Sequence, residues 1–87
     1  MESNETTWRP HPLEVGQTYF AAESFRGSPN AEFVCGSRYV LKAVNYSRYD
    51  SMTIFSFQPA DGGPHFQWWW HDTEPDTQCK ERWRVAA

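Results

Sequence analysis

The stretch His65-Phe66-Gln67-Trp68-Trp69-Trp70 determines the fold expected for this chain. It follows Pro59-Ala60-Asp61-Gly62-Gly63-Pro64, the strongest turn-forming run in the sequence, and it precedes the polar run Asp72–Asp76. A short aromatic segment between two such boundaries is typical of a β-strand, because aromatic side chains favour strands. We therefore predict a strand over residues 65–70 that pairs antiparallel with a strand over residues 52–58.

The three consecutive tryptophans cannot all enter one core if this stretch is a strand. Neighbouring side chains on a strand point to opposite faces, so Phe66, Trp68 and Trp70 share one face and Trp69 lies on the other. A single hydrophobic core lies against one face only. Something must then cover the second face, and four covers remain open: an N-terminal arm that carries Trp8, the loop at residues 72–79, a second copy of the chain, or a partner protein.

Other short apolar runs bounded by turn residues predict further strands. They cover residues 18–25, 32–35, 38–46 and 51–58. Between them, Arg26-Gly27-Ser28-Pro29-Asn30 predicts a loop, and Ser47–Asp50 predicts the turn of a hairpin. Residues 82–85 fit a strand and a helix equally well, and Asp76 predicts the cap of one short helical turn near residues 76–81.

Residues 38–46 form the clearest predicted strand. Strict alternation places Tyr39, Leu41 and Ala43 on one face and Val44 on the opposite face. Together the segments predict a mainly β fold of five to six short strands, arranged either as a small barrel or as a strongly curved antiparallel sheet.

The size and composition fit one small domain with an aromatic core. The chain has 87 residues, and fifteen of them are aromatic. Only Leu13, Leu41 and Ile54 are leucine or isoleucine, so aromatic rings must supply most of the core. Residues 1–12 are polar and contain prolines, which predicts a flexible arm, and residues 13–87 form the single predicted domain.

The net charge, the hydropathy and the N-terminal residues bear on the partners and the cellular location of the protein. The formal net charge is −3, and nucleic-acid binding needs a basic face, so the overall acidity argues against it. No apolar run approaches the ~20 residues of a membrane helix, and the acidic N-terminus does not resemble a signal peptide. We therefore predict a cytoplasmic protein in which Cys35 and Cys79 are free thiols.

Metal and catalytic chemistry have little support in the sequence. His65, His71, Cys35 and Cys79 lack the CxxC or HxxxH spacing of a zinc site. A nucleophilic pair of Cys79 and His71 has no third group to orient it, and the paired glycines of the turn do not precede a helix as a phosphate-binding loop requires. We predict no enzyme activity and no cofactor, and we keep a metal or Cys/His catalytic site as the last alternative.

Three segments resemble a family of small bacterial domains of unknown function. They are Leu13–Tyr19 with its Gly-x-x-Tyr pattern, the glycine-led strand Gly36–Leu41, and Tyr46–Phe55 with a Tyr-Asp turn before an apolar strand. The resemblance covers roughly residues 13–58. It implies an SH3-like barrel and no activity, and the segment Trp68–Asp72 departs from the family pattern.

We predict a non-enzymatic domain that binds another protein through an aromatic and acidic surface. Aromatic anchors supply binding energy, and carboxylates attract a basic surface on the partner. The candidate contact residues are Trp68, Trp69, Trp70, His71, Asp72, Glu74, Asp76, Tyr46 and Tyr49. Small acidic domains of this kind are similar in general character to phage inhibitors of bacterial defence and to immunity proteins that block toxins, so an inhibitor is one form of this function.

A small barrel that binds single-stranded nucleic acid is the second hypothesis. Bases stack on aromatic side chains along a positive groove in such barrels. Arg38, Lys42 and Arg48 lie close in sequence to Tyr46 and Tyr49, but no basic stripe extends beyond them. A homodimer is the remaining option, in which a second copy covers the outward tryptophan.

Overall fold

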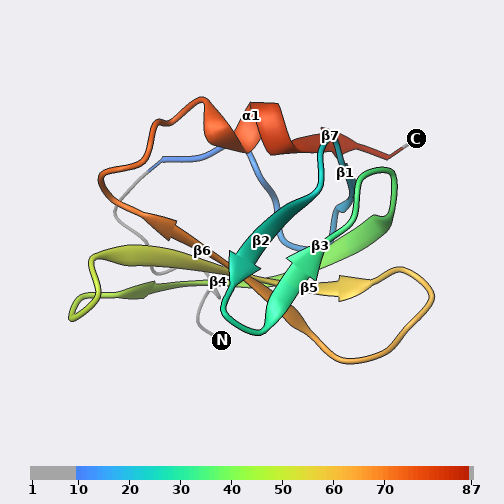
Figure 1. The fold of residues 1–87 in the computed structure, drawn as a ribbon, viewed down its shortest axis with the longest axis horizontal. Coiled ribbons are helices and arrows are strands. Elements are labelled where there is room, and N and C mark those ends of the chain that lie inside the picture. The colour runs from blue at the N-terminus through green and yellow to red at the C-terminus, as the bar shows by residue number, and fades with distance from the viewer. Residues whose placement is uncertain (1–9, 87) are drawn as a thin grey trace.

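The computed structural model describes residues 10–86, and the fold is mainly β, with 49% of residues in strands and 6% in helix. In chain order (Figure 1) the elements are β1 (Thr18–Ala21), β2 (Phe25–Ser28), β3 (Ala31–Phe33), β4 (Arg38–Ser47), β5 (Met52–Pro59), β6 (Phe66–His71), α1 (Gln78–Arg82) and β7 (Trp83–Val85). The predicted mainly β class is confirmed, with seven strands among the described residues in place of five to six.

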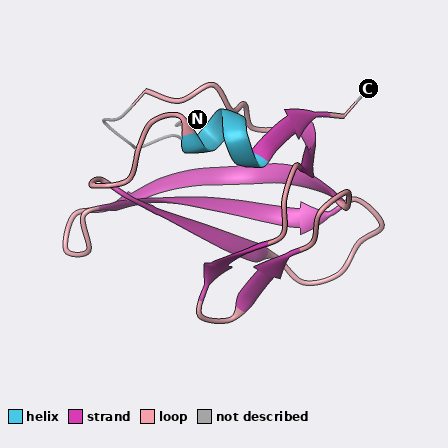
Figure 2. Ribbon diagram, turned by 45° about the horizontal axis from the view of Figure 1, so that its top comes forward, coloured by secondary structure: helices cyan, strands magenta, loops and turns pink. Residues whose placement is uncertain are grey.

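Five strands form one antiparallel sheet in the order β6-β5-β4-β1-β7, and β2 and β3 form a separate hairpin. Figure 2 shows this hairpin as a pair of short strands directly below the larger sheet. The predicted pairs of β4 with β5 and of β5 with β6 are confirmed.

The larger sheet curves strongly but does not close into a barrel. Its curvature brings Trp83 of β7 onto Phe57 of β5, with 4.2 Å between the ring centroids. The edge strands β6 and β7 do not pair with each other in the described structure. The curved-sheet alternative is therefore confirmed, and the barrel that the family resemblance implied is not formed.

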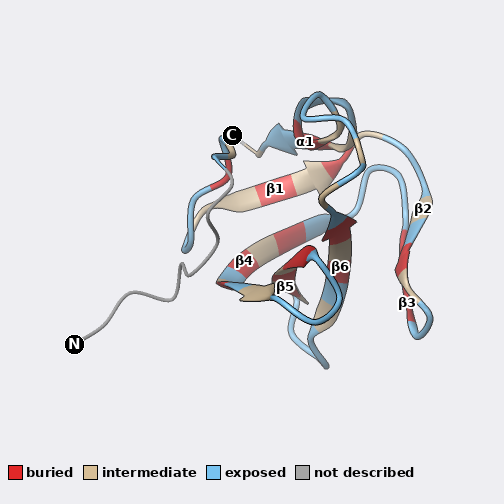
Figure 3. Ribbon diagram, turned by 90° about the vertical axis from the view of Figure 1, so that its left-hand side faces the viewer, coloured by how far each residue is buried: buried red, intermediate tan, exposed pale blue. Residues whose placement is uncertain are grey.

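The core lies on the side of the sheet that carries Phe55, Trp68 and Trp70, which we call the inner face; the opposite side is the outer face. Phe55 and Trp68 stack with 5.0 Å between ring centroids. The β2–β3 hairpin covers the inner face through Phe33, and α1 covers it through Cys79, both fully buried. Figure 3 shows the buried residues as bands along the strands.

β4 carries an irregularity that strict alternation does not anticipate. Its register with β5 shifts by one residue between Leu41 and Ala43, so Lys42 has no partner on β5. A β-bulge of this kind reverses the faces of the residues that follow it. Val44 is therefore buried with Tyr39 and Leu41, and the prediction that placed Ala43 with them is wrong.

The predicted loop over residues 26–30 is mostly strand. Only the Pro29-Asn30 pair turns, and the residues before it belong to β2. Gly27 makes this possible, because a Cβ there would lie 2.4 Å from the ring of Phe33 and 2.8 Å from the backbone oxygen of Gln67. The glycine that suggested a loop instead allows β2 to approach β6 closely.

Both ends of the fold differ from the prediction in detail. The predicted strand over residues 18–25 is interrupted after Ala21, before β2 begins. At the C-terminal end, residues 82–85 were predicted as either helix or strand, and both occur. Arg82 ends α1, and the three residues after it form β7. Thr77 and not Asp76 is the N-cap residue of α1, and no side chain caps this helix by a hydrogen bond, so the predicted capping role of Asp76 is wrong.

The predicted flexible arm, residues 1–12, falls mostly outside the described residues, and Trp8 with it. Of its described residues, His11 packs its ring edge against Phe55, with 5.0 Å between ring centroids. The flexibility of the arm and the domain boundary at residue 13 stay predictions. Across residues 10–86, the helical structure includes no segment with the length and apolarity to cross a bilayer.

Candidate functional site

Most of the predicted contact residues gather at one end of the larger sheet. The β4–β5 turn and the chain that follows β6 meet there (Figure 1). His71 pairs with Met52, the first residue of β5, and the Asp72 N–H donates to the Ser51 carbonyl at 2.9 Å. Tyr49 lies in the β4–β5 turn and is fully exposed. The topology thus brings the Tyr46–Tyr49 region and the tryptophan run together.

The tryptophan run divides between two faces, as the alternation predicts. Trp68 and Trp70 lie on the inner face with 1% and 0% of their surface exposed. The Trp70 indole N–H donates to the Pro75 carbonyl at 3.4 Å, which ties the loop after β6 to the core. Trp69 is half-buried on the outer face, and its indole N–H donates to Gln67 Oε1 at 3.1 Å. Of the three rings, only that of Trp69 is placed to contact a partner.

The acidic residues after β6 do not form one patch. The Tyr46 hydroxyl donates a short hydrogen bond to the carboxyl oxygen Oδ2 of Asp72, at 2.5 Å. Glu74 Oε2 lies 3.2 Å from His71 Nδ1. Asp76 lines a separate cavity, next to the start of the described chain. Asp72 therefore holds the loop to the sheet, and only Glu74 faces the groove beside Trp69.

An open groove of about 460 Å³ lies beside β6. One wall is the end of β2 with the turn that follows it, and the other is β6 with the loop that follows it. The lining residues are Arg26, Gly27, Ser28, Pro29, Trp69, His71, Glu74 and Arg82. We call this the Trp69 groove.

Two arginines line the Trp69 groove in different surroundings. The Arg82 guanidinium lies 4.4 Å from the ring centre of Phe25, and its Nε lies 3.5 Å from Glu23 Oε2. Arg26 donates one hydrogen bond, to the Pro29 carbonyl at 3.5 Å, and forms no ion pair within residues 10–86. Neither arginine is predicted as a site residue from the sequence, because residue 26 lies in a predicted loop and residue 82 in a segment that fits helix and strand equally well.

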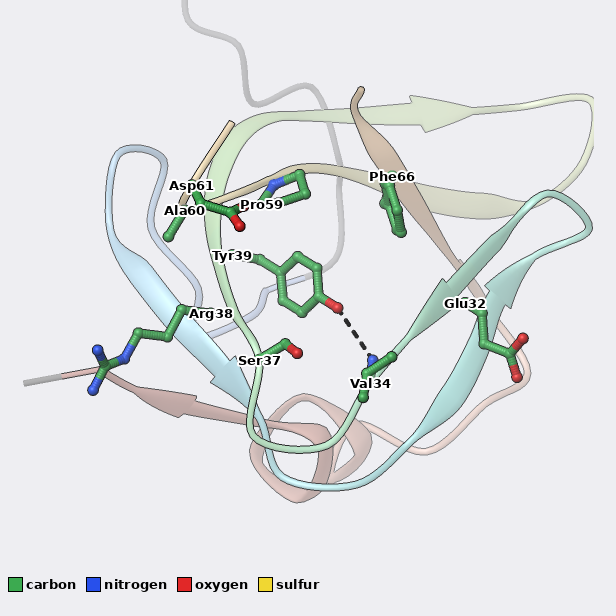
Figure 4. Close-up of a pocket in the computed structure, with 9 residues that line it drawn as sticks. All are labelled: Glu32, Val34, Ser37, Arg38, Tyr39, Pro59, Ala60, Asp61 and Phe66. Atoms are coloured by element: carbon green, nitrogen blue, oxygen red, sulfur yellow. Dashed lines mark hydrogen bonds between the residues drawn. The ribbon is translucent and has the colours of Figure 1, made fainter. Parts of the chain in front are cut away.

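A second pocket of about 430 Å³, which the sequence does not predict, opens at the opposite end of the sheet. Figure 4 shows Tyr39 at its centre, between Phe66 and Arg38. The Tyr39 hydroxyl accepts a hydrogen bond from the Val34 N–H at 3.1 Å, which fixes the ring. We call this the Tyr39 pocket. Its lining residues are Glu32, Val34, Ser37, Arg38, Tyr39, Pro59, Ala60, Asp61 and Phe66.

The cysteine and histidine side chains considered for chemistry are dispersed. Cys79 is fully buried in the core, whereas His71 is exposed at the end of β6. Cys35 is exposed, and its thiol donates to the Ala22 carbonyl at 3.4 Å. Both cysteines are free thiols, as predicted. Between residues 10 and 86, no three His, Cys, Asp or Glu side chains lie close enough together to hold a metal ion.

The basic residues of the nucleic-acid hypothesis are spread along β4 and the turn after it. Arg38 lines the Tyr39 pocket, Lys42 sits at the bulge, and Arg48 lies beside Tyr49. These three side chains therefore do not line one groove next to the aromatic residues.

Comparison with known proteins indicates the fold and assigns no function. No protein-family model matches the chain, and no curated protein matches it. Among solved structures, an integron cassette protein from the mobile metagenome of Vibrio cholerae is similar, with 20% sequence identity and a TM-score of 0.68 over 85% of this chain and 86% of that chain. The likeness shows a shared fold, and the SH3-like family of the resemblance is not confirmed.

Proposed function

We propose that this chain is a non-enzymatic domain that binds another protein through the Trp69 groove and the neighbouring turn that carries Tyr49. One observation carries the proposal. Trp69 is only half-buried beside an open groove, while Trp68 and Trp70 on either side of it are fully buried. Large apolar side chains at a surface groove often mark interaction sites, and a small domain otherwise needs its rings in the core.

The two aromatic side chains are suited to act as anchors. The Trp69 indole is held by its hydrogen bond to Gln67, so binding orders it little further. Tyr49 is fully exposed at the tip of the β4–β5 turn. Tryptophan and tyrosine are enriched among the few residues that supply most of the binding energy at protein interfaces.

The acidic part of the predicted surface has a smaller role in this proposal. Tyr46 donates to Asp72, and His71 lies beside Glu74, so these carboxylates interact within the molecule. The aromatic residues therefore carry the binding, and a basic partner is not required. Inhibition of the bound protein is one form that such a binding domain takes.

Site-specific photo-crosslinking in the native host tests the proposal. A photoreactive phenylalanine analogue replaces Tyr49 and, in a separate protein, Val34 of the Tyr39 pocket. Position 49 is expected to capture one predominant partner protein, and position 34, at the opposite end of the sheet, is not. Equal capture of the same protein from both positions would place the contact elsewhere.

Trp69→Ala then tests the anchor. The variant is expected to keep the circular dichroism of the parent and to lose partner capture by about tenfold or more, as a hot-spot residue does. Ile54→Ala is the matched control, because Ile54 lies opposite Trp69 on the outer face but does not line the groove. Undiminished capture by the folded Trp69→Ala protein, or unfolding of that variant, contradicts the proposal.

A further inference from the structure

β6 lies at the edge of the larger sheet, so one side of its backbone has no neighbouring strand there. Within the described chain, β6 pairs with β5 alone. A free edge of this kind can accept another strand, which is a common way for an extended peptide to join a sheet. The groups available for such pairing are those that point away from β5.

Two observations show which N–H and C=O groups of β6 point toward β5 and which point toward the free edge. The Asp72 N–H donates to the Ser51 carbonyl at 2.9 Å, so the backbone at position 72 faces β5. The Gln67 carbonyl points the opposite way, since a Cβ on Gly27 of β2 would lie 2.8 Å from it. In an antiparallel strand the N–H and C=O of one residue point to the same side, and the side alternates along the strand. The N–H and C=O of Trp69 therefore face the free edge.

The hairpin covers only the first half of this edge. Gly27 brings β2 against Gln67, and the hairpin then turns at Pro29. Figure 3 shows β2 and β3 beside β6. Beyond this contact the Trp69 groove opens, and among the described residues no strand pairing joins Trp69 to the hairpin. One backbone donor and one acceptor thus face an open groove next to the half-buried indole of Trp69.

The charge at the groove indicates the chemistry of its occupant. Arg82 already has Glu23 within ion-pair distance, and the Glu74 carboxylate that faces the groove lies 3.2 Å from His71 Nδ1. Arg26 lies at the rim with one long hydrogen bond to the Pro29 carbonyl, and its cross-strand neighbour Glu32 lines the other pocket without pairing with it. An acidic side chain on the occupant would give Arg26 a charged partner.

We infer that the free edge of β6 binds an extended acidic segment of a partner protein, which adds to the sheet as an antiparallel strand. One residue of the segment exchanges both backbone hydrogen bonds with Trp69, and an Asp or Glu of the segment pairs with Arg26. This inference rests on the proposed function and specifies the kind of segment that the Trp69 groove takes.

A phage-displayed library of short random peptides, selected on the full chain, provides the probe. The selected peptides are expected to contain Asp or Glu among β-branched residues, which favour extended strands. Addition of a selected synthetic peptide should slow the hydrogen exchange of the Trp69 amide in NMR spectra. The Trp70 amide faces β5 and should keep its exchange rate.

Charge variants test the role of Arg26. Arg26→Glu is expected to weaken binding of the acidic peptide by about tenfold or more, and Arg26→Lys should retain most of the affinity. Arg38→Glu is the matched control, because Arg38 lines the Tyr39 pocket at the opposite end of the sheet. An equal loss in the Arg26 and Arg38 variants would reduce the effect to net charge and overturn the assignment.

The remaining outcomes separate this inference from the proposed function. Selected peptides without acidic residues, no selected peptide, or binding that leaves the Trp69 amide unchanged overturns strand addition. A dimer in sedimentation with the same protection of the Trp69 amide assigns the edge to a second copy and also overturns it. If crosslinking at position 49 captures a partner but no selected peptide protects the Trp69 amide, the proposed function is supported and the inference of strand addition is wrong.

Discussion

Trp68 and Trp69 are adjacent in the chain and belong to the same strand, yet their surroundings are opposite. Trp68 stacks on Phe55 and is 1% exposed. Trp69 is in register with Ile54 on the other face and lines an open groove. The β2–β3 hairpin and α1 cover the inner face, where Trp68 lies, and this cover gives the two identical side chains different surroundings.

The largest expected effect on stability comes from removing the buried ring of Trp68. Trp68→Ala is expected to lower the free energy of unfolding by about 3–5 kcal/mol, because it leaves a cavity in the aromatic core. Trp69→Ala should lower it by less than about 1 kcal/mol, because its ring already borders solvent. Urea denaturation followed by circular dichroism measures both. Equal losses would mean that the two faces of β6 are equally packed.

A conservative variant keeps this comparison measurable if Trp68→Ala does not fold. Trp68→Phe retains one aromatic ring against Phe55 and should lose only part of the stability. The order expected for the free energy of unfolding is then Trp69→Ala above Trp68→Phe above Trp68→Ala. A Trp68→Phe protein as stable as the parent would show that the core does not depend on the size of this ring.

The two-residue period of a strand was sufficient to predict this division. It assigned Trp68 and Trp70 to one face and Trp69 to the other, and the turn-forming residues 47–50 and 59–64 predicted the antiparallel pairs on both sides of β5. It failed at Lys42, since an extra residue in one strand is set by pairing with β5 and leaves no mark in local composition. The reversal at Val44 follows from that single residue.

The Trp69 groove could not be predicted from the sequence, for a different reason. Gly27 and Pro29 are turn formers in isolation, and their roles depend on packing against residues distant in the sequence. Gly27 contacts Phe33 on the next strand and Gln67 on β6. A contact between β2 and β6 cannot be inferred from either segment alone, so the arginines that line the groove were not recognised as part of a site.

A moderate effect is expected where the hairpin meets β6. Gly27→Ala introduces a Cβ that would lie 2.4 Å from the Phe33 ring, so the hairpin must shift away from the sheet. Overpacking of this kind costs about 1–3 kcal/mol of unfolding free energy. Ser28→Ala, one residue further along β2, is the control and should change stability by less than about 0.5 kcal/mol. Urea denaturation of both variants measures the two losses in unfolding free energy. A Gly27→Ala protein as stable as the parent would show that the hairpin packs loosely on the inner face.

The smallest expected effect concerns Tyr19, a polar group on the covered side of the sheet. Burial raises the pKa of its hydroxyl, and the carboxylate of Glu14 adds to the rise, while the hydrogen bond from the Glu14 N–H, at 2.8 Å, opposes it. The folded state therefore holds this proton more tightly than the unfolded chain does. The resulting stability is present in full below the unfolded pKa of about 10 and is lost as the pH rises from there through the folded pKa.

Tyr19→Phe isolates this contribution. The variant loses the hydrogen bond from Glu14 at every pH, so its stability is lower throughout, but it has no hydroxyl to ionise. Urea midpoints of the parent and the variant, measured from neutral pH into the alkaline range, should therefore converge as the pH rises above about 10. Parallel curves would mean that the inner face does not exclude water from Tyr19, and that the contrast between the two faces of the sheet is confined to the rings of β6 and β5.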